Sequence, residues 1–247
     1  MRRTLAVVAL LLLGCGSGGH GGRPTLVVSA ASSLRNAFAA YASVFGPAQV
    51  RLSFGGSDDL AAQIRAGAPV DVYAAANTKL PDQLYADGRV DRPLAFTANR
   101  LVLAVPAHSK LRSLADAAAP GLKLAIGASS VPVGEYTHHV LLGLPAGERA
   151  HILANVKSEE PDVAGIVGKL TQGAVDAGFV YATDVTAAKG ALRAIPLPAK
   201  LQPVVVYEAA VVKGTKHAAQ ARAFVAGLRS GAGRRALRSA GFLPVPR

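Results

Sequence analysis

Three loops of this 247-residue chain combine serines or glycines with the start of a predicted helix, at 30–33, 55–57 and 129–134. A fourth predicted helix starts at 162–163. The first N–H groups of a helix have no partner within it, and the helix start carries about half a positive charge. Several helix starts that converge on one point can therefore bind an anion without any cationic side chain. A serine at a single helix start is also an ordinary N-cap, so the functional interpretation depends on the set.

Each loop follows a predicted strand, so the surrounding elements decide where the loops meet. After the first loop, Leu34, Phe38 and Tyr41 lie on one face of a predicted helix, for which Ser32 or Ser33 is a suitable N-cap. Strands and helices alternate over the first hundred residues, a pattern that predicts a parallel sheet flanked by helices. In such sheets, ligands bind beyond the carboxyl ends of the strands, which is where these loops fall.

A second α/β unit and a late apolar strand at 203–212 predict a two-lobed molecule whose chain crosses twice between the lobes. We expect lobe I to comprise 25–99 together with 208–247, and lobe II to comprise 100–207. The predicted fold class is therefore α/β, with one sheet in each lobe.

Composition excludes several classes of protein. Hydrophobic residues make up 51% of the chain and charged residues 17%, which favours a packed core over disorder. A single cysteine excludes a disulfide framework and a cysteine-based zinc site. The formal net charge of +12 favours anionic partners.

The amino terminus is typical of an export signal. Arg2 and Arg3 precede a short apolar run that ends at Gly14-Cys15, and this run is too short to span a bilayer as a helix. It resembles the bacterial lipoprotein signal, in which the chain is cut before the cysteine and that cysteine is acylated. We expect 1–14 to be a lipoprotein signal peptide, Cys15 to be lipidated, and 15–24 to form a flexible tether. The alternative is an ordinary secretory peptide with an incidental cysteine.

Segments in order along the chain resemble the periplasmic molybdate-binding proteins of ABC transporters. They are 31–38 (ASSLRNAF), 54–57 (FGGS), 67–72 (GAPVDV), 131–136 (VPVGEY), 162–163 (DV) and 178–184 (GFVYATD). The resemblance implies a periplasmic-binding-protein fold, with mixed, mostly parallel sheets in two lobes joined by a two-strand hinge. It also implies capture of molybdate or tungstate by hinge closure and delivery to a membrane permease. The protein would be an exported monomer in the periplasm or at the cell surface, held to the membrane by its lipid.

Carried over by position, the resemblance assigns hydroxyl and backbone donors to Ser33 and Ser57, backbone N–H donors to Val133 and Val163, and a phenolic donor to Tyr181. It implies no cofactor, no catalytic residue and no direct ligand to a metal cation. Molybdate only accepts hydrogen bonds, and hydrogen bonds to a charged acceptor are the stronger class. A set of neutral donors therefore suits this ligand.

The chain departs from the family pattern beside the second loop. Asp58 and Asp59 stand where Ser, Gly or Thr is common, and Gly56 replaces a frequent serine. Two carboxylates suit the first turn of a helix, so we expect both to point to solvent. Turned into the cleft, they would repel an anion.

Three alternatives belong beside this interpretation. The ligand could be another tetrahedral oxyanion, such as sulfate or phosphate. An exported serine hydrolase would use Ser129 or Ser130, but the sequence offers no positioned base. A nucleic-acid binder would use the basic C-terminal helices, which carry few aromatic residues. His138, His139 and His151 lack metal-site spacing, and we expect them on a solvated face.

Overall fold

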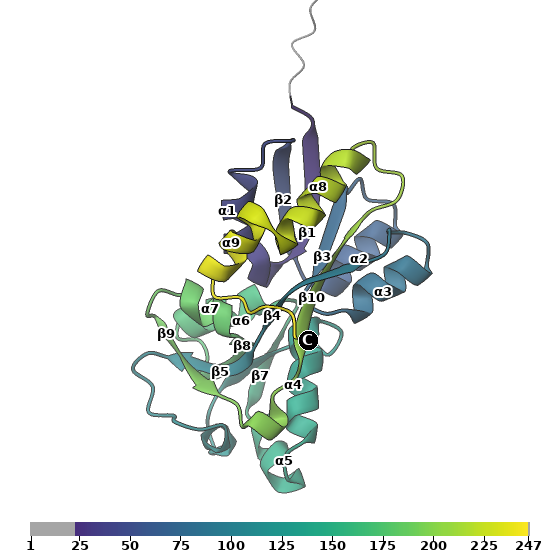
Figure 1. Ribbon diagram of the computed structural model, residues 1–247. Helices are drawn as coiled ribbons and strands as arrows, with labels where there is room; N and C mark the ends of the chain where they lie inside the picture. The colour runs from purple at the N-terminus through teal and green to yellow at the C-terminus, as the bar shows by residue number, and fades with distance from the viewer. Residues whose placement is uncertain (1–22, 247) are drawn as a thin grey trace, which may run out of the picture.

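The computed structural model describes residues 23–246, which form two lobes with one five-stranded sheet each (Figure 1). The first sheet has the order β2-β1-β3-β10-β4, with β1 (Thr25–Ala31), β2 (Gln49–Gly55), β3 (Val72–Ala75), β4 (Leu94–Asn99) and β10 (Val205–Val211). The second has the order β7-β6-β8-β5-β9, with β5 (Leu101–Pro106), β6 (Leu124–Gly127), β7 (Val156–Glu160), β8 (Ala177–Tyr181) and β9 (Leu192–Pro196). In each sheet the first three strands are parallel and the fourth runs antiparallel to both neighbours. The predicted α/β fold with two mixed, mostly parallel sheets is confirmed.

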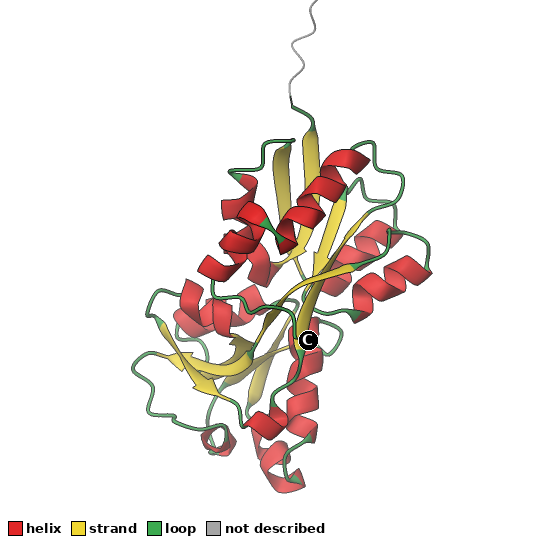
Figure 2. Cartoon of the chain, viewed as in Figure 1, coloured by secondary structure: helices red, strands yellow, loops and turns green. Residues whose placement is uncertain are grey.

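Helices flank both sheets (Figure 2). The first lobe contains α1 (Arg35–Ala42), α2 (Ser57–Arg65), α3 (Lys79–Ala86), α8 (Ala218–Arg229) and α9 (Gly231–Ser239). The second contains α4 (Pro132–Leu142), α5 (Ala146–Ala154), α6 (Val163–Thr171) and α7 (Ala182–Ala187). Short 3-10 turns lie at η1 (Ser32–Leu34), η2 (Ala115–Ala118) and η3 (Ala199–Leu201). None of the helices among residues 23–246 is both long and apolar enough to cross a bilayer.

Strand β3 shows why the first lobe needs helices on both faces of its sheet. Val72 and Ala74 join the core beneath α1, α8 and α9, whereas Tyr73 and Ala75 join a second core beneath α2 and α3. Since successive side chains of a strand point to opposite faces, a strand that is apolar throughout must be covered twice.

An aromatic cluster attaches the C-terminal helices to the first lobe. The ring of Phe224 in α8 lies 5.6 Å from that of Phe38, 4.6 Å from Tyr41 and 5.3 Å from Phe45. Tyr41 also donates its hydroxyl hydrogen to the Phe224 carbonyl at 3.3 Å. The pairs with Phe38 and Phe45 are edge-to-face, an arrangement that adds to the stabilisation that comes from burial alone.

The two crossings between the lobes lie side by side. Strand β4 ends at Asn99 and β5 begins at Leu101, and between them the Asn99 side chain accepts the Arg100 N–H at 2.9 Å where the chain leaves the first sheet. On return, Val205 already pairs with Asn99. The chain therefore rejoins the first sheet at Val205, before residue 208, where the second segment of lobe I was expected to begin.

Glu208 in β10 gives the fold a pH dependence that can be measured. One carboxylate oxygen is buried and has no partner among the described residues, and burial, with the charge of Asp82 as a second cause, raises the pKa from 4.5 to about 7. A carboxyl whose pKa is raised on folding stabilises the folded state at low pH, and that contribution is lost as pH rises toward the folded-state value. We expect Glu208→Gln to be more stable than the wild type at pH 8, with the advantage shrinking toward pH 5.

Urea unfolding at both pH values measures this difference. Glu159→Gln, at an exposed carboxylate in β7, is the matched control and should leave the pH dependence unchanged. Parallel pH profiles for Glu208→Gln and the wild type would contradict the interpretation.

Candidate functional site

One small cavity between the lobes brings together all five residues that the sequence singled out. Its volume is about 20 Å³. Its lining is Ala31, Ser32, Ser33, Gly55, Gly56, Ser57 and Ala76 from the first lobe, and Val131, Pro132, Val133, Asp162, Val163 and Tyr181 from the second. The cavity lies beyond the carboxyl ends of β1, β2 and β3, as expected for an open α/β sheet.

Ser33 reaches the cavity from η1 rather than from an N-cap. The expectation that Ser32 or Ser33 caps the helix is wrong, because the chain enters a 3-10 turn after Ala31 and neither η1 nor α1 has a side-chain cap. The Ser33 hydroxyl instead lies 3.0 Å from the hydroxyl of Tyr207 in β10. This serine is therefore held by the returning strand and not by its own helix.

Ser57 begins α2 and is almost fully buried. Its Oγ accepts the Ala76 N–H at 3.2 Å, and its carbonyl accepts the Tyr73 hydroxyl at 2.6 Å. Because a hydroxyl has only one hydrogen and Oγ already accepts from the backbone, the hydrogen of Ser57 is free for a ligand in the cavity.

The second lobe supplies two helix starts. Val133 lies in the first turn of α4, directly after Pro132, and its N–H has no carbonyl of the helix within reach. Gly134 allows this turn to pack on the preceding loop, because a Cβ there would come 1.9 Å from the Ala128 carbonyl oxygen. Helix α6 starts at Val163, whose N–H is likewise in the first turn.

The cap of α6 is Asp162, which follows Pro161 and accepts the Gly165 N–H at 3.1 Å. The cap takes up a different N–H and leaves that of Val163 available.

Tyr181 stands at the end of β8 and is 1% exposed. Its hydroxyl has no hydrogen-bond partner among the described residues, although it belongs to a residue that lines the cavity. Burial first, and then the neighbouring Tyr207, Tyr136, Asp184 and Glu135, raise the pKa of Tyr181 well above 10. The phenol is therefore protonated at neutral pH and is a hydrogen-bond donor in need of an acceptor.

Asp184 fixes the backbone beneath Tyr181. Its carboxylate accepts the Tyr181 N–H at 3.0 Å, and burial raises the pKa of Asp184 to about 7. Asp184 therefore holds the backbone N–H of Tyr181, the residue whose side chain lines the cavity.

Asp58 and Asp59 lie differently from each other. Asp59 is exposed, as expected, but Asp58 is half-buried and one of its oxygens is fully buried, so the expectation that both point to solvent is wrong for Asp58. Neither residue lines the cavity. Gly56 makes the burial of the Asp58 carboxylate possible, because a Cβ at this position would come 2.9 Å from Asp58 Oδ1 and 2.5 Å from the Pro161 carbonyl oxygen. The missing side chain at Gly56 leaves room for the carboxylate and for the opposite lobe.

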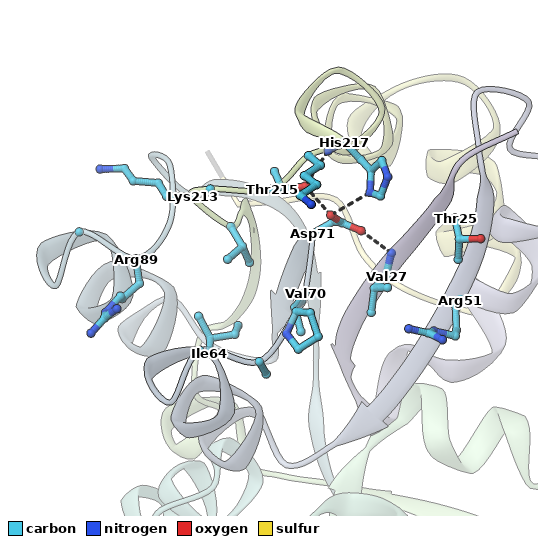
Figure 3. A pocket seen from close by; sticks show the side chains of 17 residues that line it. Thr25, Val27, Arg51, Ile64, Val70, Asp71, Arg89, Lys213, Thr215 and His217 are labelled. Carbon is cyan, nitrogen blue, oxygen red and sulfur yellow. Dashed lines mark hydrogen bonds and ion pairs between the residues drawn. The ribbon is translucent and has the colours of Figure 1, made fainter.

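A wider hollow at the other end of the first lobe has a different character (Figure 3). There Asp71 accepts the Val27 N–H at 2.6 Å, and its other oxygen contacts the Thr215 hydroxyl and His217 Nδ1. This carboxylate joins the starts of β1, β3 and α8, while Arg89 and Lys213 point away from it in Figure 3. At the centre of this hollow, the Asp71 carboxylate therefore links these three elements of the first lobe.

Three further observations complete the comparison with the sequence-based predictions. Among residues 23–246, no group of three or more His, Cys, Asp or Glu side chains is placed to hold a metal ion. Sequence reasoning missed Tyr207, which contacts Ser33, since a tyrosine within an apolar strand carries no signal beyond that of a core residue. Cys15 lies outside the described residues.

Known proteins show the same organisation. Residues 26–243 match the family of bacterial extracellular solute-binding proteins. The chain is 33% identical over 252 residues to the molybdate-binding protein ModA of Mycobacterium tuberculosis, covering 96% of this chain and 94% of that protein. It is 28% identical to ModA of Haemophilus influenzae, covering 95% of each chain.

A solved structure extends the likeness to the fold. The periplasmic molybdate-binding protein of Azotobacter vinelandii superposes with a TM-score of 0.75 at 24% identity, over 90% of this chain and all of that one. The family match over 26–243, with 33% identity to a relative across nearly the whole chain, shows that this protein belongs to the bacterial extracellular solute-binding proteins.

Proposed function

We propose that this protein captures molybdate, and also tungstate, in the cavity between its lobes and delivers it to the permease of an ABC transporter. The observation that carries the proposal is the buried hydroxyl of Tyr181, which has no partner among the described residues and belongs to the lining of a cavity shared with Ser33 and Ser57. The molybdate-binding relatives support the identity of the ligand.

The donor set suits a fully deprotonated tetrahedral anion. Hydroxyls of Ser33, Ser57 and Tyr181 and the N–H groups of Val133 and Val163 are all neutral donors, and two of them lie at helix starts that favour negative charge. A dianion with four acceptor oxygens can pair with these groups without offering a hydrogen of its own. Because the donors come from two lobes, a set spaced for molybdate would bind the smaller sulfate less well.

Closure of the lobes completes the site. Neither lobe alone holds all five donors, so the closed form is the one that the ligand stabilises. The lobes touch where Pro161 approaches Gly56, and Lys79 of α3 contacts Glu135 of α4 at 2.9 Å. That ion pair is exposed and contributes little by itself, so the ligand supplies most of the difference between the two forms.

Export and anchoring follow from the amino-terminal sequence. We propose that Cys15 carries the lipid and that the glycine-rich segment after it tethers the first lobe to the membrane. Strand β1 begins at Thr25, at the end of the first lobe that lies away from the second lobe (Figure 1). The cavity would then remain open to solution while the anchor stays at the membrane. No bond of the ligand is made or broken, so the protein acts by binding alone.

Removal of the Tyr181 hydroxyl tests the proposed ligand. In isothermal titration calorimetry, the chain from Gly16 should bind molybdate and tungstate at 1:1, whereas sulfate and phosphate should give no comparable heat. Tyr181→Phe should weaken molybdate binding roughly ten- to a hundredfold, the size of one hydrogen bond to a charged acceptor. Tyr85→Phe, at a half-exposed tyrosine in α3, should bind as the wild type does. Silence of the wild type with both metal oxyanions would refute the assignment.

A side chain at Gly56 tests closure. The backbone of Gly56 is extended, with φ −61° and ψ 136°, so alanine suits this backbone conformation, but its Cβ would stand 2.5 Å from the Pro161 carbonyl oxygen of the other lobe and 2.9 Å from Asp58 Oδ1 of its own lobe. Gly56→Ala should therefore disfavour the closed form and weaken molybdate binding roughly tenfold or more, since apparent affinity scales with the population of the competent state.

Asp58→Ala removes the contact within the first lobe, so the ligand-free Gly56→Ala/Asp58→Ala variant should unfold as Asp58→Ala does, because the remaining clash exists only when the lobes meet. Gly46→Ala is the control, since a Cβ there meets nothing within 4 Å. Wild-type affinity in Gly56→Ala would show that binding does not need the observed approach of Pro161.

A further inference from the structure

We propose that Tyr207 and Asn99 are positioning residues that orient the Ser33 hydroxyl, so that its hydrogen is available to the ligand. The proposal rests on the proposed function and adds to it the residues that hold Ser33 as a donor. Neither residue lines the cavity, so both act through Ser33.

The direction is set first at Asn99, which is 5% exposed. Its Oδ1 accepts the Arg100 N–H at 2.9 Å, and a backbone N–H can only donate, so this atom must be the amide oxygen. The amide nitrogen therefore points the other way, where it lies 2.8 Å from Thr183 Oγ1 and 3.4 Å from the Tyr207 hydroxyl. An amide nitrogen cannot accept, so the oxygen of Tyr207 receives a hydrogen from Asn99.

The direction then passes to Ser33 through Tyr207, whose side chain is fully buried. The oxygen of its hydroxyl accepts from Asn99, and the acceptor left for its hydrogen among the described residues is Ser33 Oγ at 3.0 Å. The opposite arrangement, in which Ser33 donates to Tyr207, would leave the hydrogen of a buried phenol unpaired, which is unfavourable. Tyr207 therefore donates to Ser33.

The consequence for Ser33 is the same as that for Ser57. Each serine oxygen already accepts a hydrogen bond from the protein, Ser33 from Tyr207 and Ser57 from the Ala76 N–H, so each serine hydrogen is directed into the cavity. A hydroxyl that already accepts one hydrogen bond has a single lone pair left, so these serines donate more readily than they accept. A protonated oxyanion such as hydrogen phosphate must place its own hydrogen on an acceptor, and these serines offer it fewer acceptor positions than free hydroxyls would.

Packing keeps this chain of hydrogen bonds in place. The Tyr207 ring lies 5.4 Å from Phe242, 6.3 Å from Phe96 and 5.9 Å from Tyr181, each in an edge-to-face arrangement. Tyr207 and Asn99 also lie on β10 and β4, the two strands that connect the lobes, while Thr183 belongs to the second lobe. The ligand-binding hydroxyl of the first lobe is thus oriented by the hinge.

A double-mutant cycle on binding tests the proposal. Tyr207→Phe should weaken molybdate binding roughly tenfold and should reduce the ratio of molybdate to phosphate affinity, because Ser33 is then free to rotate. Ser33→Ala and the double variant Ser33→Ala/Tyr207→Phe should bind alike, since Tyr207 acts through Ser33. Tyr41→Phe, which removes a buried hydroxyl bonded to the Phe224 carbonyl, is the matched control and should not affect binding. Additive losses, or wild-type affinity in Tyr207→Phe, would overturn the proposal.

The same four proteins, unfolded in urea without ligand, test the hydrogen bond itself. Coupling between Ser33 and Tyr207 in stability is expected, and zero coupling would overturn the chain of hydrogen bonds whatever the ligand is. If coupling is present but the wild type binds none of the tetrahedral anions, the proposed function fails and the role in binding fails with it. The two failures are therefore distinguishable.

Asn99→Asp offers a test by reversal. The aspartate can still accept the Arg100 N–H, but its second oxygen accepts where the amide nitrogen donated, so Tyr207 should turn its hydrogen to that carboxylate and accept from Ser33. At a pH where both ligands are dianions, the added charge alone would weaken molybdate and phosphate equally. A loss confined mainly to molybdate supports the reversal, whereas equal losses would contradict it.

Discussion

A buried hydrogen-bond donor needs an acceptor, and this constraint explains the cavity between the lobes. The phenol of Tyr181 is closed off from water with no partner among the described residues, and the N–H groups of Val133 and Val163 lie at helix starts. An anion that only accepts hydrogen bonds removes this deficit, and each bond to a charged acceptor is worth roughly 1.5–3 kcal/mol. The closed arrangement of the lobes is therefore the arrangement that such a ligand stabilises. A cationic side chain could bind an anion too, but it would not set geometry or number of hydrogen bonds so narrowly.

The approach of the lobes depends on what Gly56 lacks. The Pro161 carbonyl oxygen and a carboxylate oxygen of Asp58 both use the space that a side chain at Gly56 would fill. The two departures from the family pattern in this loop are therefore related, since the glycine leaves room for the Asp58 carboxylate beside the cavity, and the carboxylate does not line the cavity. Asp58 also lies in the first turn of α2, where the helix dipole favours a carboxylate and offsets part of the cost of burying it.

The sequence predicted the fold and the loops that meet beyond the strands because both follow from local patterns, whereas the five site residues were assigned from the resemblance to a known family. Strand and helix alternation specifies which loops share an edge of a sheet, and small residues mark the helix starts, as at Ser57 and Val163. It did not predict β4, whose residues 94–99 lack a strong pattern, nor the capping at Ser33, where a 3-10 turn replaced the expected N-cap. It also gave no sign of Tyr207. Side chains that act through another residue over a long separation leave no periodicity or spacing in the chain.

Tyr207 illustrates why such residues belong to the hinge. A hydroxyl in a loop can rotate, so its direction is set by a neighbouring group that can only donate or only accept. Here that group is the backbone N–H of Arg100, which orients the Asn99 amide. The amide then orients the Tyr207 hydroxyl, and Tyr207 orients Ser33. The starting point is the peptide where the chain leaves the first lobe, and Asn99 also contacts Thr183 of the second. The strands that connect the lobes thus also hold the Ser33 hydroxyl in the orientation in which it donates to a ligand.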